Sequence, residues 1–245
     1  PSTLRMGLEK SRNLMTARLA MTLGMKGVQD YAKRFGLNSE LPPLLSMSLG
    51  AGETTLLRLT AAYGMLVNGG RKITPSLIDR IQDRNGKTIY RHDKRDCAAC
   101  SAPQGWSGQP IPQLPDTRER LTDPLSAFQM VSMLEGVIQR GTGRSIRNLG
   151  LVVAGKTGTS QTRTITEEER ELQIKQKDLP YKRRDHALFT AFAPYKNPRY
   201  AISVVIEHGG TGSSGAAPIA KKLIKRILER HKLREKNQLD LFQEA

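Results

Sequence analysis

Four consecutive residues, Lys156-Thr157-Gly158-Thr159, bring together a cation, two hydroxyl groups and a glycine backbone. They follow the apolar run 151–155, which is typical of a buried strand. Side chains alternate between the two faces of a strand, so the lysine and the glycine should share one face and the two threonines the other. A cation and hydroxyl groups hold carboxylates, and a glycine lets another backbone lie close. This stretch is therefore the candidate site, on a strand at the edge of a sheet.

Two glycine patterns in the sequence raise the alternative of a nucleotide-binding protein. Gly150 to Thr157 fits G-x-x-x-x-G-K-[ST], but the positions between its glycines are the apolar run itself, and no helix pattern follows the lysine. Gly210 to Gly215 fits G-x-G-x-x-G, but no later strand follows to carry a ribose-binding carboxylate. We interpret the second pattern as a flexible Gly/Ser turn, and nucleotide binding is the less favoured reading of both.

The charge of the chain points to an anionic partner. Its 245 residues carry a formal net charge of +16, which suits nucleic acid, a membrane surface or a carboxylate-bearing substrate. No zinc-finger spacing, RNA-binding aromatic strand or basic-region heptad accompanies this charge, so we expect no nucleic acid partner. No apolar run approaches the roughly 18 residues of a membrane span, and the start lacks a signal-peptide pattern.

The chain has only two cysteines, Cys97 and Cys100. They favour a local loop disulfide or two free thiols, because a zinc site would need His92 and a further ligand from elsewhere. The sequence predicts no metal and no cofactor.

Helical periodicity and capping residues place five helices in the chain. Ser11-Arg12-Asn13 should break the first helical stretch, Thr54 or Thr55 should cap the third helix, and Asp123-Pro124 should start the fourth. The third helix is expected to be buried. The predicted helices cover residues 4–23 with that break, 28–35, 56 to the stop at 68–70, 124 to the stop at Gly141, and 216–238.

Alternating apolar residues and turn signals predict two further strand pairs. Residues 77–82 and 87–91 flank Asn85-Gly86, a typical hairpin turn, and residues 187–193 and 200–206 flank Asn197-Pro198. Between the elements we expect an irregular insertion over 91–120 and a charged loop over 161–185.

The predicted C-terminal helix, 216–238, is basic and amphipathic. Its apolar residues should form one face, and packing of that face on the preceding strands is favoured over membrane binding. The residues expected on this face are Ile219, Leu223, Ile224, Ile227 and Leu228.

With these elements in place, the sequence resembles the transpeptidase domain of the penicillin-binding proteins. Ser11-x-Asn13 on a helix break and Lys156 to Gly158 on a strand match that family's S-x-N and K-T-G motifs in order. Further tracts resemble its class A, bifunctional branch before residue 155 and its class B, elongation-type branch after it. The mixture leaves open a natural mosaic, a recombined or designed sequence, or a wrong assignment of branch. These tracts are 11–24, 48–55, 68–70 and 129–143 for class A, and 184–195 and 207–210 for class B.

The resemblance implies an α/β fold of the α+β type, shared with serine β-lactamases, in which helices flank an antiparallel sheet. Residues 1–245 would form one partial transpeptidase domain, incomplete at its N-terminus. Peptidoglycan stem peptides and β-lactam antibiotics would be its ligands, and a membrane surface or cell-wall synthesis proteins further partners. The parent protein would act at the periplasmic face of a bacterial inner membrane.

The resemblance also implies roles for the site residues in serine acyl transfer from D-Ala-D-Ala peptides. Ser11 would pass a proton to the leaving amine, Asn13 would bind the donor peptide amide, and Lys156 would set the field and hydrogen-bond Ser11. The Thr157 and Thr159 hydroxyls would hold the terminal carboxylate, and the glycine between them would let the peptide approach. The Thr159 amide would join the oxyanion hole.

One motif of the family, S-x-x-K with the nucleophilic serine, occurs nowhere in the sequence. Because the family carries it before S-x-N, we expect the chain to be a fragment that begins after it and cannot form an acyl-enzyme. The alternative is a non-catalytic module that keeps the fold and binds anionic cell wall or membrane through its basic surface.

Overall fold

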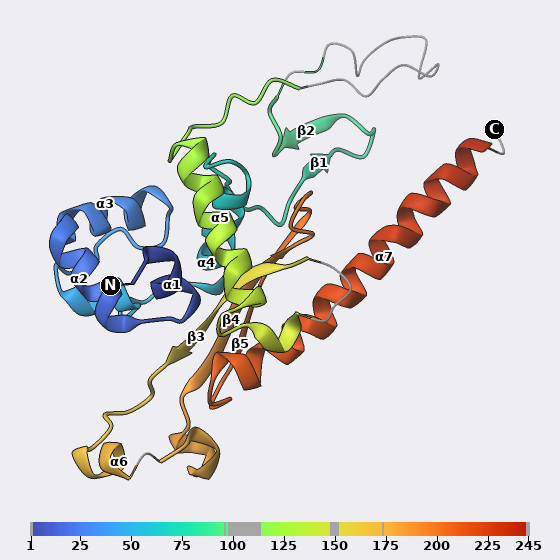
Figure 1. The fold of residues 1–245 in the computed structure, drawn as a ribbon. Helices are drawn as coiled ribbons and strands as arrows, with labels where there is room; N and C mark the ends of the chain where they lie inside the picture. Colours follow the sequence, from blue (N-terminus) through green and yellow to red (C-terminus); the bar gives the residue numbers. More distant parts are fainter. Residues whose placement is uncertain (1, 96, 98–113, 148–151, 173, 244–245) are drawn as a thin grey trace.

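The centre of the molecule is a three-stranded antiparallel sheet in the order β3-β4-β5. The computed structural model describes residues 2–95, 97, 114–147, 152–172 and 174–243. The strands are β3 (Ala154–Ser160), β4 (His186–Ala193) and β5 (Tyr200–Ile206). Helices α4 and α5 cover one face and α7 the other (Figure 1). The predicted fold, an antiparallel sheet flanked by helices, is confirmed.

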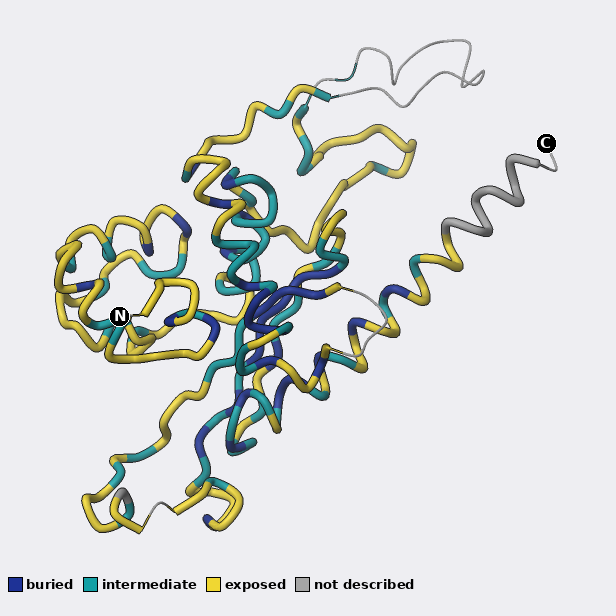
Figure 2. The backbone as a smooth tube through the Cα atoms, viewed as in Figure 1, coloured by how far each residue is buried: buried dark blue, intermediate teal, exposed yellow. Residues whose placement is uncertain are grey.

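Strand β4 is the most deeply buried element, because it lies between two other strands and under helices on both faces (Figure 2). Its Phe189 is 0% exposed and belongs to a cluster with Ile224 and Leu228 of α7. Its Phe192 points to the opposite face and packs with Leu134 of α5. The alternation of the sequence thus builds one core on each side of the sheet.

The N-terminal helices form a lobe beside the sheet (Figure 1). The break predicted at 11–13 is confirmed, since α1 (Leu4–Glu9) ends before it and α2 (Asn13–Leu23) begins within it. Helix α3 (Met25–Arg34) starts three residues earlier than predicted. A 3₁₀ helix, η1 (Leu45–Leu49), occupies a stretch that the sequence presented only as a Gly/Ser-rich approach to the next helix.

The two helices that cover the front of the sheet begin at predicted caps. The Thr55 side chain accepts a hydrogen bond from the Arg58 amide at the start of α4 (Leu56–Val67). The Asp123 carboxylate likewise accepts from the Ser126 amide at the start of α5 (Pro124–Gln139). The expectation that the first of these helices is buried is wrong for its first turn, where Leu56 is 44% exposed.

The predicted hairpin around Asn85-Gly86 forms as β1 (Arg80–Gln82) and β2 (Thr88–Arg91), with Gly86 at a φ of 82°. Most of the predicted irregular insertion, residues 96 and 98–113, lies outside the described residues. Within it Cys97 is disulfide-bonded, which is one of the two states expected from the sequence. Cys100 lies outside the described residues.

The charged segment 161–185 contains three short helices, α6 (Glu167–Glu171), η4 (Gln176–Asp178) and η5 (Tyr181–Arg183). Reciprocal hydrogen bonds join η4 to the end of the segment, because the Gln176 amide nitrogen donates to the Asp185 carboxylate at 2.7 Å and the Asp185 backbone amide donates to the Gln176 side-chain oxygen at 2.8 Å. The segment projects from the end of the sheet in Figure 1.

The Gly/Ser stretch after β5 is an ordered turn, so the prediction that it is flexible is wrong. It forms a π-helical turn, η6 (Gly212–Ala216), capped by the Thr211 side chain. A Cβ on Gly212 would lie 2.4 Å from the carbonyl oxygens of both Gly158 and Leu188. Only a glycine fits this close to two strands, so Gly212 is a packing residue.

Helix α7 (Ala217–Gln243) follows directly and packs on the sheet, as expected, but with a different face. Ile224 and Leu228 are buried as predicted, whereas Ile219 is 40% and Leu223 44% exposed. Alanines bring the helix axis close to the strands and so rotate the contact toward Ala217 and Ala220, both 0% exposed. Within the described residues, no helix has the length and apolar character needed to cross a bilayer.

Candidate functional site

The candidate site lies on β3, at the edge of the sheet. The strand starts at Ala154, later than the apolar run predicted, so Val152 and Val153 precede it, and Leu151 lies outside the described residues. Lys156 pairs with Thr190 and Thr157 with Phe189 in the register with β4. Because Phe189 belongs to the core under α7, Thr157 lies on the α7 face, and Lys156 lies on the face of the helical lobe.

Lys156 reaches the helix break of the N-terminal lobe. Its ammonium group donates to the Ser11 hydroxyl at 2.6 Å and to the Thr157 carbonyl oxygen at 3.0 Å. Burial lowers the pKa of Lys156 below its ordinary value, because a charged amine is less well solvated there. Ser11 has a φ of 54°, a left-handed conformation that is costly for a residue with a side chain. The backbone of the break therefore holds the hydroxyl against the lysine at a cost in strain.

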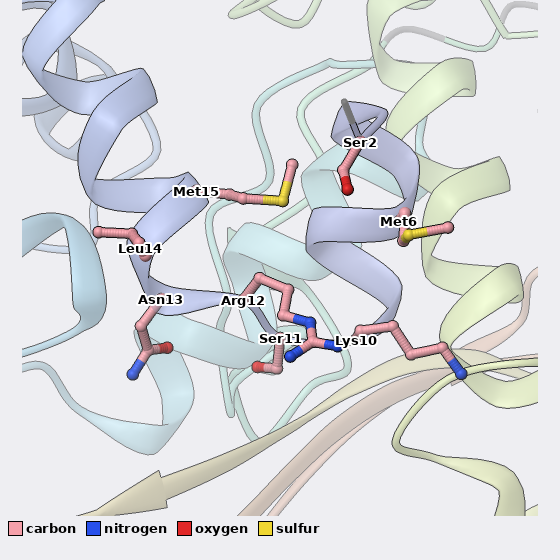
Figure 3. Close-up of a pocket in the computed structure, with 8 residues that line it drawn as sticks. All are labelled: Ser2, Met6, Lys10, Ser11, Arg12, Asn13, Leu14 and Met15. Atoms are coloured by element: carbon pink, nitrogen blue, oxygen red, sulfur yellow. The ribbon is translucent and has the colours of Figure 1, made fainter.

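Asn13 begins α2 on the other side of Ser11 from Lys10, as Figure 3 shows. Its side chain is exposed at an open hollow of about 550 Å³. Ser11 and Asn13 thus lie together on one wall, as the sequence predicted, although their roles in a reaction stay predictions. The hollow is lined by Ser2, Met6, Lys10, Ser11, Arg12, Asn13, Leu14 and Met15.

Thr142 belongs to the site as well, although no motif in the sequence marks it. Its hydroxyl lies 2.7 Å from the Thr157 hydroxyl, so the two side chains share a hydrogen bond. Thr142 follows α5 in the loop before η3 (Arg144–Ile146). It falls in the tract 129–143 that resembled the family, and this tract was the only signal that could have directed attention to it.

The last two site residues differ in their surroundings. A Cβ on Gly158 would lie 3.3 Å from the Leu188 side chain, and the η6 turn packs against the Gly158 backbone. The glycine therefore serves close packing within the chain, besides any role toward a ligand. Thr159 is exposed, one residue before the end of the strand.

The charged side chains around Ser11 are cationic. Lys156, Lys10 and Arg12 lie at or beside Ser11, whereas Glu9 of the same lobe is buried and paired with arginines. Among the described residues, no group of three or more His, Cys, Asp or Glu side chains could hold a metal ion. The surroundings favour an anionic group such as a carboxylate beside the β3 hydroxyls.

A model for the penicillin-binding protein transpeptidase domain matches residues 1–225. Among curated proteins, the chain is 47% identical over 159 residues to penicillin-binding protein 1A of Rickettsia conorii. It is 38% identical over 160 residues to penicillin-binding protein 1A of Neisseria gonorrhoeae. The alignments cover 64% of this chain but only 20% and 18% of these relatives. The chain thus spans about a fifth of the length of the curated relatives it matches.

The fold resembles solved transpeptidase structures. The D,D-transpeptidase domain of a peptidoglycan glycosyltransferase from Eggerthella lenta superimposes with a TM-score of 0.66 at 22% identity, covering 95% of this chain and 54% of that one. The penicillin G acyl-enzyme complex of penicillin-binding protein A from Mycobacterium tuberculosis superimposes with a TM-score of 0.64 at 22% identity, covering 92% and 48%. At these identities, the superpositions show the fold alone.

Proposed function

Because this chain belongs to the penicillin-binding protein transpeptidase family, we propose that it carries one wall and the substrate strand of a peptidoglycan D,D-transpeptidase. The observation that carries the proposal is the 2.6 Å contact between Lys156 and Ser11, which joins the two family motifs across the sheet edge. The proposed substrates are D-Ala-D-Ala stem peptides, and β-lactam antibiotics are the proposed inhibitors. The proposed location is the periplasmic face of a bacterial inner membrane.

In the proposed reaction, the donor peptide lies extended along the edge of β3. The Thr157 and Thr159 hydroxyls hold its terminal carboxylate, and the Thr159 amide donates to the developing oxyanion. Asn13 binds the donor amide from the opposite wall. A nucleophilic serine bonds to the carbonyl carbon, and Ser11, hydrogen-bonded to the Lys156 ammonium, passes a proton to the departing D-alanine amine as the carbonyl–nitrogen bond breaks. An acceptor amine on a neighbouring peptide then takes the acyl group.

The nucleophilic serine for this step is absent from the 245 residues, because the sequence contains no S-x-x-K. The chain matches only about a fifth of its curated relatives' length, which leaves room for the motif elsewhere in a parent protein. We therefore propose that this chain alone forms no acyl-enzyme.

Labelling with a fluorescent penicillin tests the proposal. The 245-residue chain should not be labelled, whereas a longer version that includes an S-x-x-K motif should be. In that longer version, Lys156→Ala should reduce labelling at least about tenfold, because the site loses its cation and the partner of Ser11. Lys72→Ala serves as the matched control, since Lys72 forms an exposed ion pair with Glu119.

Labelling of the short chain would contradict its proposed inactivity, and unchanged labelling of the Lys156→Ala variant would overturn the site assignment. A second candidate function is a non-catalytic module that binds anionic cell wall or membrane, which the net charge of +16 favours. A longer version that contains S-x-x-K, folds and still takes no label would favour that module.

A further inference from the structure

Glu9, the last residue of α1, carries a buried carboxylate. Only 7% of its side chain is exposed. It accepts hydrogen bonds from the Arg140 guanidinium at 2.6 and 3.2 Å, and Arg5 lies 3.8 Å away. A buried charge is tolerated when it is paired in this way. Arg140 is the first residue after α5 and lies 131 positions after Glu9, so the pair links the C-terminal ends of α1 and α5.

Backbone contacts reinforce the link. The Thr142 amide donates to the Glu9 carbonyl oxygen at 3.2 Å, and the Lys10 ammonium donates to the Arg140 carbonyl oxygen at 2.7 Å. Residues 9–10 and 140–142 are therefore joined by hydrogen bonds from both their main chains and their side chains.

Two glycines leave the space that this link occupies. A Cβ on Gly136 would lie within bonding distance of the Glu9 carboxylate, and a Cβ on Gly141 would lie 2.2 Å from the Glu9 carbonyl oxygen. The clash at Gly136 would push the Glu9 and Arg140 side chains apart, and the clash at Gly141 is with backbone atoms, so it could be relieved only by moving α1 away from α5. The surface of α5 is thus shaped to receive the end of α1.

The positions just beyond the link are the ones that contact β3. Ser11 follows Glu9 by two residues and meets Lys156, and Thr142 follows Arg140 by two residues and meets Thr157. Lys156 and Thr157 are neighbours that point to opposite faces of the strand. The two segments therefore reach the edge strand from opposite sides of the sheet.

We propose that the Glu9–Arg140 pair is a positioning device that sets Ser11 and Thr142 around the edge of β3, and that Glu9 and Arg140 are positioning residues for the proposed transpeptidase site. When the pair is broken, the Ser11 loop moves away from Lys156 and the lysine becomes hydrated. The inference rests on the proposed function only for its effect on catalysis, because the geometric link stands without it.

The first experiment follows the side chain of Lys156 by NMR in the 245-residue chain labelled with ¹³C-lysine, with the Lys156 signal assigned from a Lys156→Arg variant. In Arg140→Met, the titration midpoint of Lys156 should rise by roughly half a pH unit or more, because hydration restores the charged form. Arg5→Gln is the matched control. It removes the longer 3.8 Å ion pair to the same carboxylate and the two 3.2 Å hydrogen bonds from Arg5 to Ser132 of α5, but it leaves the Arg140–Glu9 contacts intact. The midpoint should therefore stay in place.

The second experiment measures acylation by a fluorescent penicillin in the longer version with S-x-x-K, where Arg140→Met should slow acylation about tenfold or more. A lower melting temperature with an unmoved Lys156 signal would overturn the positioning role, since the pair would then be merely structural. A moved signal with unchanged acylation would support the positioning role and refute the proposed site. If Arg140→Met does not fold, Arg140→Lys, which keeps the charge but loses the paired contacts, replaces it in both measurements.

Discussion

The buried ammonium of Lys156 makes stability depend on pH in a specific direction. Its folded-state pKa lies below the ordinary lysine value of 10.5, so the unfolded chain binds more protons between the lowered pKa and 10.5. The contribution of Lys156 to the free energy of unfolding should therefore rise with pH through that window and be lowest on its acidic side. Below the folded-state pKa the full cost of burying the charge is present.

Urea unfolding of the chain and of Lys156→Met across that alkaline window measures this effect. The difference in unfolding free energy between the two proteins should shift in favour of the wild type as pH rises. Lys72→Met controls for the loss of an exposed lysine. A difference that stays flat with pH would show that Lys156 is not desolvated.

Thr142 should matter through the Thr157 hydroxyl it contacts. Thr142→Val keeps the shape but removes the hydrogen bond, and we expect a loss of about 1 kcal/mol in unfolding free energy. Thr16→Val is a suitable control, because the Thr16 hydroxyl is exposed and donates to the carbonyl oxygen of Arg12, the N-cap of its own helix. Equal melting temperatures for Thr142→Val and wild type would contradict the prediction.

For individual residues, the sequence predicted contacts where two motifs of one family lie on different elements. It placed Ser11 opposite Lys156, and the structure brings these side chains together. Thr142 could not be found in the same way, since its contact depends on where the loop after α5 crosses the strand. The Glu9–Arg140 pair was missed for the same reason, because its partners are distant in sequence and no local pattern marks them.

The η6 turn packs so closely on the sheet that a larger residue at Gly212 would clash with it. Gly212→Ala would place a methyl group against the carbonyl oxygens of Gly158 and Leu188, so we expect a loss of about 1–3 kcal/mol in unfolding free energy. Gly27→Ala is a matched control that should raise the unfolding free energy instead of lowering it. Nothing lies within 4 Å of its Cβ position in α3, and alanine favours a helix by up to about 1 kcal/mol.

Thermal melting of both glycine variants tests this contrast. A Gly212→Ala protein as stable as wild type would mean that the turn is as flexible as the sequence indicated.

Local signals explain which elements could be predicted. The caps at Thr55 and Asp123, the Asn85-Gly86 hairpin and the strands β4 and β5 each follow from neighbouring residues. The π-helical turn and the contact face of α7 depend instead on how closely the backbone approaches the sheet. Alanine and glycine make that approach, yet they contribute little to a hydrophobic pattern.

Large apolar side chains are exposed on the helical lobe and on the first turns of α5. Soluble monomers rarely expose large continuous apolar patches, so such side chains indicate binding or association surfaces. The most exposed of them are Leu4, Leu14, Met21, Leu23, Leu125 and Phe128, with exposed fractions of 61%, 65%, 64%, 66%, 72% and 64%.

We expect the 245-residue chain to enhance the fluorescence of an apolar dye such as anilinonaphthalene sulfonate. Replacing Leu14 and Met21 together with Gln should reduce the enhancement while leaving the melting temperature nearly unchanged, since exposed side chains contribute little to the core. Ala20→Gln is the contrasting variant, because Ala20 is 3% exposed and should cost stability. Unchanged dye binding by the double variant would place the apolar surface elsewhere.

The arrangement of the layers came from the family resemblance rather than from periodicity. Periodicity indicates helices and strands, but it does not say which helix covers which face. The small residues of β4, buried on both sides, are consistent with strands covered by helices, and the superposed transpeptidase structures share that arrangement.

The position of β3 at the edge of the sheet also affects the solubility of the protein. A strand with one unpaired side can recruit the same strand of another copy and start an aggregate. A charge in the middle of such a strand opposes that pairing, and Lys156 sits two residues into β3. Removing its charge would therefore make the protein more prone to aggregate. Preparations of Lys156→Ala should be compared with wild type at low protein concentration, where self-pairing cannot be mistaken for a lost site.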